Sequence, residues 1–320
     1  MAIRLGTRGS ALALAQAHHV AGLLRPAHPD VEIVEITTTG DRARALVDKE
    51  KWVKELELAL QAGEIDLAVH SAKDVPGELP DGLDLLGAPA RADARDALCG
   101  AASLEALPAG ARVGTSSLRR AAQVLAARED VSVVEIRGNV DTRLRKLAEG
   151  EADALVLAAA GLDRLDRSSS IDAHLDFVPA PGQGVIALEG RAGDAAAGDA
   201  ARRVTDRAAW IALLCERTVV TELGATCHTP VGAHAVLDGD ALTVDVFVGL
   251  PDGGAWVTDT VRGAVGEPEE LGRVAAARVL AAGGGDLLEI AARMAAAAPN
   301  GRSTSPGQQG SAVHREGGEA

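Results

Sequence analysis

The chain has 320 residues, of which 47% are hydrophobic and only 2% aromatic, so we expect two or three domains with cores of Ala, Leu, Val and Ile. Its formal net charge of −14 at pH 7 argues against general affinity for nucleic acid or anionic membranes, so basic clusters indicate local sites. Three cysteines without paired spacing argue against a disulfide or zinc framework and predict a reducing, cytoplasmic setting. No apolar run approaches the roughly 20 residues of a membrane-spanning helix.

Predicted strands and helices alternate through the first part of the chain. In chain order we expect a strand at residues 3–5, a helix at 11–24, a strand at 31–36, a helix at about 51–62 and a strand at 65–69. Ser10 is a typical cap for the first of these helices. Val53, Leu56 and Leu60 give the second helix one apolar face. The alternation is typical of an α/β fold.

A second segment repeats this plan. The correspondences are RVGT at 112–115 with RLGT at 4–7, VSVVEI at 131–136 with VEIVEI at 31–36, and GEAD at 150–153 with GEID at 63–66. Three correspondences in the same order predict two related α/β lobes, each with a mainly parallel sheet. We assign residues 1–90 and 185–203 to the first lobe and residues 94–180 to the second.

Loops at the strand ends are the expected ligand-binding segments, because open parallel sheets bind ligands beyond the carboxyl ends of their strands. These loops are 7–10, 37–41 and 70–74 in the first lobe, and 115–120, 137–143 and 158–164 in the second. They should line a cleft between the lobes. They carry the arginines Arg8, Arg119, Arg120, Arg137, Arg143 and Arg164, which favours an anion site over solvated charges.

The sequence GTSSLRR at 114–120 is the most informative of these loops. It follows a predicted strand at 111–113 and opens a predicted helix at 121–127. Ser and Thr cap helix starts, and the free N–H groups there attract anions. Two arginines in the first turn oppose the helix dipole, a penalty that a bound anion would offset. The alternative is a capped helix with two solvated arginines.

The rest of the chain predicts a hinge, a third domain and a tail. PAPGQG at 179–184 is a predicted hinge, or a segment with a purely structural role, and 185–188 a strand that returns to the first lobe. We assign residues 208–298 to the third domain. Its predicted elements are a helix around 210–217, antiparallel strands within 231–250 and 255–261, and helices at 268–282 and 287–298. Residues 299–320 have too little apolar surface to fold, so we predict a disordered tail.

A cation and a carboxylate stand side by side in HSAKDVP at 70–76, at the end of a predicted strand. Lys73 and Asp74 are either an incidental exposed pair or part of a site. A carboxylate held among cations can stabilise a developing positive charge or move a proton.

The three cysteines differ in setting. Cys99 and Cys215 lie in apolar runs and are expected to be small buried hydrophobes. Cys227 lies in GATCHTP at 224–230, a predicted loop, beside His228. A loop thiol next to His is either inert or a nucleophile or attachment point.

These segments together resemble porphobilinogen deaminase, the hydroxymethylbilane synthase family, from residue 3 to about 298. Matching blocks are TRGS at 7–10, VKELE at 53–57, AVHS at 68–71, KDVP at 73–76, GTSSLRR at 114–120, RGNV at 137–140, TRL at 142–144, AGL at 160–162 with Arg164, and GQG at 182–184. Cys227 stands at the spacing of the family's cofactor cysteine, and Pro230 and Gly232 follow it.

The resemblance implies a fold and a reaction. The fold is two lobes like those of periplasmic binding proteins around a cleft, plus a small third α/β domain with an antiparallel sheet. The cofactor is a dipyrromethane, held through a thioether to Cys227. The reaction joins four porphobilinogens head to tail on this primer with loss of ammonia, and water releases hydroxymethylbilane. The expected partners are porphobilinogen and oligopyrrole polycarboxylates, with no nucleic acid or membrane, and the expected state is a monomer.

The resemblance also assigns residues. Asp74 would be the catalytic acid–base group. Cofactor and substrate would be bound by Arg8, Ser10, Lys73, Thr115, Ser116, Ser117, Arg119, Arg120, Arg137, Gly138, Asn139, Arg143, Arg164 and Gln183. Arginine forks suit the acetate and propionate groups of each pyrrole.

Two departures from the family pattern are visible. The connection between Asp41 and Trp52 is shorter than the family's glycine-rich cover loop, and Ala225 and Thr226 replace the usual Gly-Gly before the cysteine. A non-catalytic two-lobed anion-binding protein, or a degenerate paralogue, is therefore the alternative. A binding protein needs neither a loop thiol nor a carboxylate in the cleft, which favours the enzyme over that alternative, whereas the altered loop before Trp52 is the feature that leaves a degenerate paralogue open.

Overall fold

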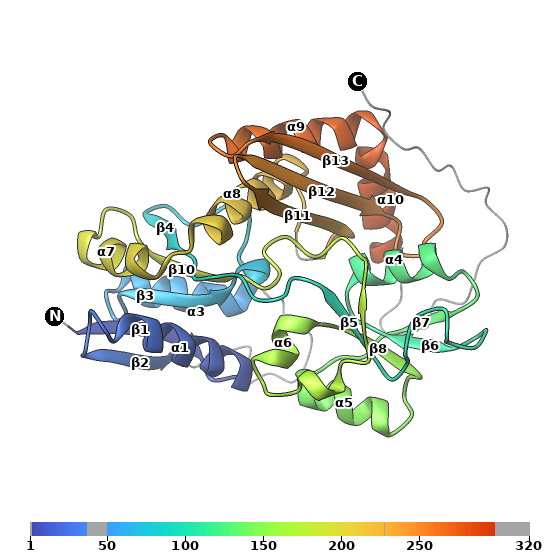
Figure 1. The fold of residues 1–320 in the computed structure, drawn as a ribbon, viewed down its shortest axis with the longest axis horizontal. Helices are drawn as coiled ribbons and strands as arrows, with labels where there is room; N and C mark the ends of the chain where they lie inside the picture. The colour runs from blue at the N-terminus through green and yellow to red at the C-terminus, as the bar shows by residue number, and fades with distance from the viewer. Residues whose placement is uncertain (1, 37–49, 227, 298–320) are drawn as a thin grey trace.

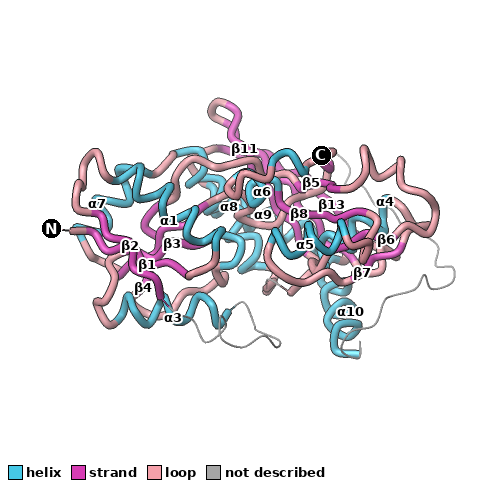
Figure 2. The backbone as a smooth tube through the Cα atoms, turned by 90° about the horizontal axis from the view of Figure 1, so that it is seen from below, coloured by secondary structure: helices cyan, strands magenta, loops and turns pink. Residues whose placement is uncertain are grey.

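The computed structural model describes residues 2–36, 50–226 and 228–297, folded around three β-sheets (Figure 1). Two five-stranded sheets lie toward opposite ends of the long axis (Figure 2), and a three-stranded sheet lies beside both. The predicted fold class is thereby confirmed. The predicted loop at 37–41, Cys227 and the predicted tail lie outside the described residues.

The first sheet has the strand order β2-β1-β3-β10-β4. Its strands are β1 (Ile3–Arg8), β2 (Val31–Ile36), β3 (Leu67–Ser71), β4 (Leu83–Gly87) and β10 (Ile186–Arg191). β1 is parallel to β2 and β3, whereas β10 is antiparallel to β3 and β4. The predicted return of the chain to this sheet after the hinge is therefore present as β10.

Helices cover both faces of the first sheet, which explains its alternating apolar side chains. Leu67 and Val69 of β3 pack with α1 (Ala11–Leu24) and α7 (Ala195–Val204). Ala68, between them, packs with α3 (Glu50–Gln61), as period-two alternation requires. Leu56 and Leu60 of α3 are fully buried, as its predicted apolar face implies.

The second sheet repeats this topology in the order β7-β6-β8-β5-β9. Its strands are β5 (Asp96–Cys99), β6 (Arg112–Gly114), β7 (Ser132–Val134), β8 (Ala154–Ala158) and β9 (Ala173–Leu175). Here too one strand, β6, is parallel to both of its neighbours, β7 and β8, and the fourth strand in the order, β5, is antiparallel to both of its neighbours, β8 and β9. The internal repeat in the sequence thus corresponds to a repeat in the fold.

The third domain is an antiparallel sheet with helices packed on it. Its elements are α8 (Arg207–Glu222), β11 (Val231–Asp238), β12 (Ala241–Gly249), β13 (Trp256–Ala264), α9 (Pro268–Ala281) and α10 (Gly284–Ala297). Val244 and Val246 of β12 are completely buried against Cys215 and Val219 of α8. α8 lies between this sheet and the first lobe (Figure 1).

Several predicted boundaries were wrong. Helix α4 (Leu118–Ala127) begins three residues early, because Ser117 caps it and accepts a hydrogen bond from the Arg120 N–H. The predicted loop at 137–143 contains the start of α5 (Val140–Ala148), and the predicted loop at 158–164 contains all of α6 (Ala159–Asp163). α5 begins where the Asn139 side chain accepts from the Thr142 N–H at 2.8 Å. No residue of α5 is fully buried, but Val140, Leu144 and Leu147 lie at helical spacing and pack half-buried against the core of the second lobe.

Glu216 of α8 ties the third domain to both crossovers between the lobes, residues 88–95 and 176–185. Its carboxylate is fully buried and accepts from Arg91 Nη1 at 2.5 Å, from the Gly182 N–H at 2.6 Å and from the Ala235 N–H at 2.7 Å. Arg91 lies in the first crossover and Gly182 in the second. One carboxylate therefore satisfies donors from three segments.

We predict that Glu216→Ala lowers the free energy of unfolding by about 3 kcal/mol, because the Arg91 charge stays buried without its partner. Denaturant unfolding of the purified variant measures this. Glu222→Ala, at an exposed position on the same helix, is the matched control and should change stability by less than about 0.5 kcal/mol. Equal losses in the two variants would contradict the prediction.

Candidate functional site

The turn that carries Lys73 and Asp74 directly follows β3, as a 3₁₀ turn over Ala72–Asp74. Ala72 and Val75 are buried on either side of it and pack with Leu213 of α8. From the same helix, the Arg217 guanidinium donates to the carbonyls of Pro76 and Gly77, each at 2.8 Å. The backbone around Asp74 is thereby fixed by packing and by hydrogen bonds, while Lys73 and Asp74 themselves are half-buried.

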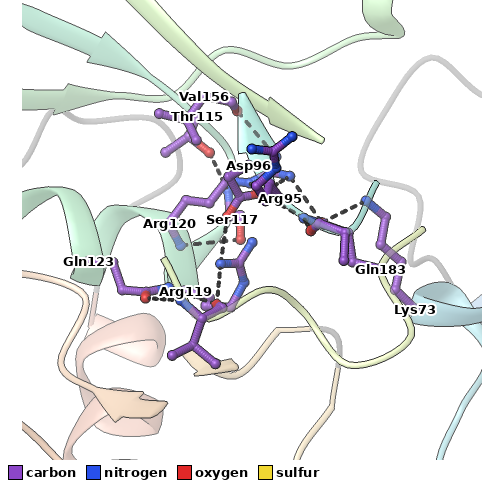
Figure 3. A network of polar contacts seen from close by, with 12 residues as sticks. Lys73, Arg95, Asp96, Thr115, Ser117, Arg119, Arg120, Gln123, Val156 and Gln183 are labelled. Atoms are coloured by element: carbon purple, nitrogen blue, oxygen red, sulfur yellow. Dashed lines mark hydrogen bonds and ion pairs between the residues drawn. The ribbon is translucent and has the colours of Figure 1, made fainter. Parts of the chain in front are cut away.

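Arg119 and Arg120, the tandem arginines of α4, are buried rather than solvated, at 2% and 6% exposure (Figure 3). Both pair with the fully buried Asp96: Arg119 Nη1 lies 2.7 Å from Oδ2, and Arg120 Nη2 lies 2.8 Å from Oδ1. Arg119 also donates to the Val178 carbonyl at 2.7 Å. The interpretation of this helix start as two solvated arginines is therefore wrong.

The group formed by Asp96, Arg119 and Arg120 has more positive than negative charge. Burial alone would raise the pKa of Asp96, but the Arg119 and Arg120 guanidiniums hold it well below its usual range, so the carboxylate is ionised. Burial lowers the pKa of Arg119, and Asp96 opposes that shift. Two guanidiniums share one carboxylate, so the group retains positive charge.

Arg143 and Arg164 add two further cations. Arg143 donates to the Gly138 carbonyl at 2.8 Å and to Ser116 Oγ at 3.2 Å, and Arg164 donates to the Gly184 carbonyl at 2.7 Å. Burial, with Arg120 nearby, lowers the pKa of Arg143 to about 10, and burial lowers that of Arg164 to about 10. Within residues 2–36, 50–226 and 228–297 no carboxylate forms an ion pair with either.

Several predicted binding residues shape helix starts. Ser10 caps α1 by accepting from the Ala13 N–H at 3.3 Å, and Ser117 and Asn139 cap α4 and α5. Thr115 is buried, and its Oγ1 accepts from the Ser117 N–H at 3.2 Å. Helix starts present partial positive charge, so these caps lie where an anion is favoured.

The remaining residues differ in their relation to the Arg119–Arg120–Asp96 group. Arg137 pairs with Glu135 at 2.6 Å, and both side chains are largely exposed. Arg8 is half-buried at the end of β1. His70 is buried, with Nε2 2.9 Å from Glu189 Oε2 of β10. Gln183 is fully buried and contacts both Lys73 and Arg120.

Sequence reasoning missed Asp96, the counter-ion of both arginines. The available signal was a carboxylate directly before Ala97, Leu98 and Cys99 of a buried strand, where an unpaired charge would be costly.

The described cysteines are inert, as predicted. Burial raises the pKa of Cys99 to about 11 and that of Cys215 to about 12, so both thiols stay protonated at neutral pH. In the described part of the chain, no cluster of three His, Cys, Asp or Glu side chains could hold a metal. Nor is any described helix long and apolar enough to cross a membrane.

The structure has two lobes of the same topology, a third domain packed on both crossovers, and more arginines than carboxylates beside the Lys73–Asp74 turn. These features define a class: a three-domain α/β protein with a cluster of buried and half-buried cations. Two family models match the chain. The model described as "Porphobilinogen deaminase, dipyromethane cofactor binding domain" matches residues 3–199, and "Porphobilinogen deaminase, C-terminal domain" matches residues 210–281. The chain belongs to the porphobilinogen deaminase family, and dipyrromethane is its cofactor.

Curated relatives agree over nearly the whole chain. The porphobilinogen deaminase of Roseiflexus sp. (strain RS-1) is 47% identical, covering 89% of this chain and 97% of the relative. That of Deinococcus radiodurans is 44% identical, covering 90% and 98%. Among solved structures, the methionine binding protein MetQ matches 63% of this chain and 89% of its own, at 16% identity and a TM-score of 0.43.

Proposed function

We propose that the residues around the Lys73–Asp74 turn carry out the porphobilinogen deaminase reaction. This transferase reaction of tetrapyrrole biosynthesis joins four porphobilinogens head to tail, releases ammonia and yields hydroxymethylbilane. The observation that carries the proposal is the family match over residues 3–199 and 210–281, which spans the site and the third domain.

The arginines fit a dipyrromethane, whose pyrroles bear acetate and propionate groups. Arg143 and Arg164 are half-buried cations that form no ion pair with any carboxylate of the described chain, and a buried charge of this kind is stabilised by an opposite one. Their planar forks match carboxylate groups. When bound, the cofactor supplies the pyrrole primer to which substrate units are added. We propose that Arg119, Arg143 and Arg164 hold its carboxylates, and that Cys227 is its attachment point.

Asp74 has the chemistry that ammonia release demands. Loss of ammonia from porphobilinogen leaves positive charge on the substrate pyrrole, and a fixed carboxylate stabilises that charge. The same carboxylate can hold or accept the proton of the pyrrole nitrogen. Lys73, beside it, supplies a cation for a substrate carboxylate. The remaining binding roles assigned by resemblance, from Arg8 and Ser10 to Arg137, are proposals of the same kind.

We also propose that the chain acts as a cytoplasmic monomer. The proposed domains are residues 1–90 with 185–203, residues 94–180 and residues 208–298, followed by the tail 299–320. Sedimentation at working concentration should therefore give the 32.6 kDa mass of one chain.

Turnover of porphobilinogen tests the function. Purified protein should release four molecules of ammonia for each hydroxymethylbilane formed. Saturable binding of porphobilinogen without ammonia release would instead support the alternative, a two-lobed anion-binding protein or degenerate paralogue.

A further inference from the structure

Gln183 lies in the second crossover with its side-chain amide saturated (Figure 3). Its Oε1 accepts from Lys73 Nζ at 3.3 Å and from Arg120 Nη2 at 3.2 Å. Its Nε2 donates to the Ala94 carbonyl at 2.7 Å and to Asp96 Oδ1 at 2.8 Å. The residue has no exposed surface. Its polar atoms are thus occupied by protein groups.

These partners belong to both lobes. Lys73 lies on the turn after β3 of the first sheet, while Asp96 and Arg120 belong to β5 and α4 of the second. Ala94 lies in the first crossover. One amide therefore links the turn of the proposed catalytic residue to the tandem arginines.

The backbone holds Gln183 in this place. Gly182 and Gly184 adopt φ values of +71° and +85°, which favour glycine. A Cβ at Gly182 would lie 2.9 Å from Ala72 Cβ and 3.1 Å from the backbone nitrogen of Lys73. The crossover thus packs directly on the catalytic turn, and Arg91 Nε donates to the Gln183 carbonyl at 2.9 Å.

The amide matches the charges around it. Its oxygen faces two cations and its nitrogen faces a carboxylate and a carbonyl, so only a side chain with both a donor and an acceptor satisfies all four. A glutamate would place a second carboxylate next to Asp96. A methionine of similar length would leave all four partners without this contact.

We propose that Gln183 is a positioning residue rather than a ligand-binding one. By joining Lys73 to the Arg120–Asp96 pair, Gln183 holds the Lys73 ammonium, beside Asp74, at a fixed position relative to the arginines that are proposed to bind the cofactor carboxylates. The catalytic part of this inference rests on the proposed function. The physical coupling of the two lobes does not.

Gln123 provides a matched control. It is also a buried glutamine that holds the second crossover, through the Val178 N–H at 2.7 Å and the Val178 carbonyl at 3.1 Å. It makes no hydrogen bond to Lys73, Asp96 or Arg120. Gln123→Met and Gln183→Met therefore both remove glutamine hydrogen bonds at this crossover, but only the second breaks the link between lobes.

Hydrogen exchange measures the coupling in the absence of substrate. We expect Gln183→Met to speed amide exchange in peptides covering both 70–77 and 117–122, and Gln123→Met to leave 70–77 unchanged. In kinetics, kcat/KM should fall at least about tenfold further in Gln183→Met than in Gln123→Met at comparable melting temperatures. Unchanged exchange at 70–77 in Gln183→Met would overturn the inference, whether or not the wild type turns over porphobilinogen. An inactive wild type would overturn only the function.

Gln183→Glu is the second variant, should the methionine variant not fold. Its carboxylate faces Asp96 as well as Lys73, Arg120 and, through Asp96, Arg119. It keeps the acceptor toward Lys73 and Arg120 but loses the donor toward Asp96 and the Ala94 carbonyl, so exchange protection at 70–77 should show a deficit at pH 7 relative to the wild type. A deficit that is absent at pH 7 would also contradict the inference.

Discussion

Cys227→Ser should yield a protein with the bare polypeptide mass and no measurable turnover, whereas the wild type carries the excess mass of a two-pyrrole adduct. A thiol ionises far more readily than an alcohol and is the stronger nucleophile, so serine does not form the corresponding bond. Intact mass under denaturing conditions, after expression in cells that make porphobilinogen, measures the adduct. A wild type with the bare mass would count against the enzyme reading.

The other two cysteines are the controls for this experiment. Burial raises the pKa of Cys99 to about 11 and of Cys215 to about 12, so neither supplies a thiolate at neutral pH. Cys99→Ala and Cys215→Ala should therefore keep the adduct, although both remove buried volume. An adduct that persists in Cys227→Ser and disappears in either control would refute the assignment of Cys227.

Local signals explain which parts of the fold could be predicted. The helix at 11–24 and the strand at 31–36 were predicted with the bounds that α1 and β2 have. Their signals, a capping serine and a run rich in β-branched residues, are local and lie within or directly beside each element. α5 was missed although Asn139 caps it and Val140, Leu144 and Leu147 lie at helical spacing, because its first residues fall within the loop predicted at a strand end. The repeat predicted two sheets, but only pairing shows β5 and β10 as antiparallel strands within them.

The site was less predictable than the fold, because its contacts span long stretches of chain. The position of Arg119 and Arg120 at a helix start predicted a bound anion, whereas the anion that the structure places beside them is the side chain of Asp96 on β5. Gln183 meets its partners Asp96 and Lys73 at sequence separations of 87 and 110 residues. Placement on strand-end loops and the family resemblance predicted that these groups bind a ligand, whereas their mutual pairing depends on the folded chain.

Asp74→Asn should lower kcat at least about 100-fold, because an amide neither carries the negative charge nor accepts the proton that the reaction requires. Asp74→Glu keeps the charge but displaces it by one methylene, so its kcat should lie between those of the wild type and Asp74→Asn. Steady-state rates of ammonia release with saturating porphobilinogen measure this order. The two variants separate charge from position.

Stability controls complete this prediction. Ala72 and Val75 anchor the turn in an apolar cluster with Leu213, so Asp74→Asn should leave the melting temperature nearly unchanged. Asp84→Asn, at an exposed position of β4 in the same lobe, makes the same chemical change away from the turn and should retain wild-type kcat. If Asp74→Asn kept more than a tenth of the wild-type kcat, the charge that develops on the substrate would have to be stabilised by another group. Asp74 would then act in binding rather than in the chemical step.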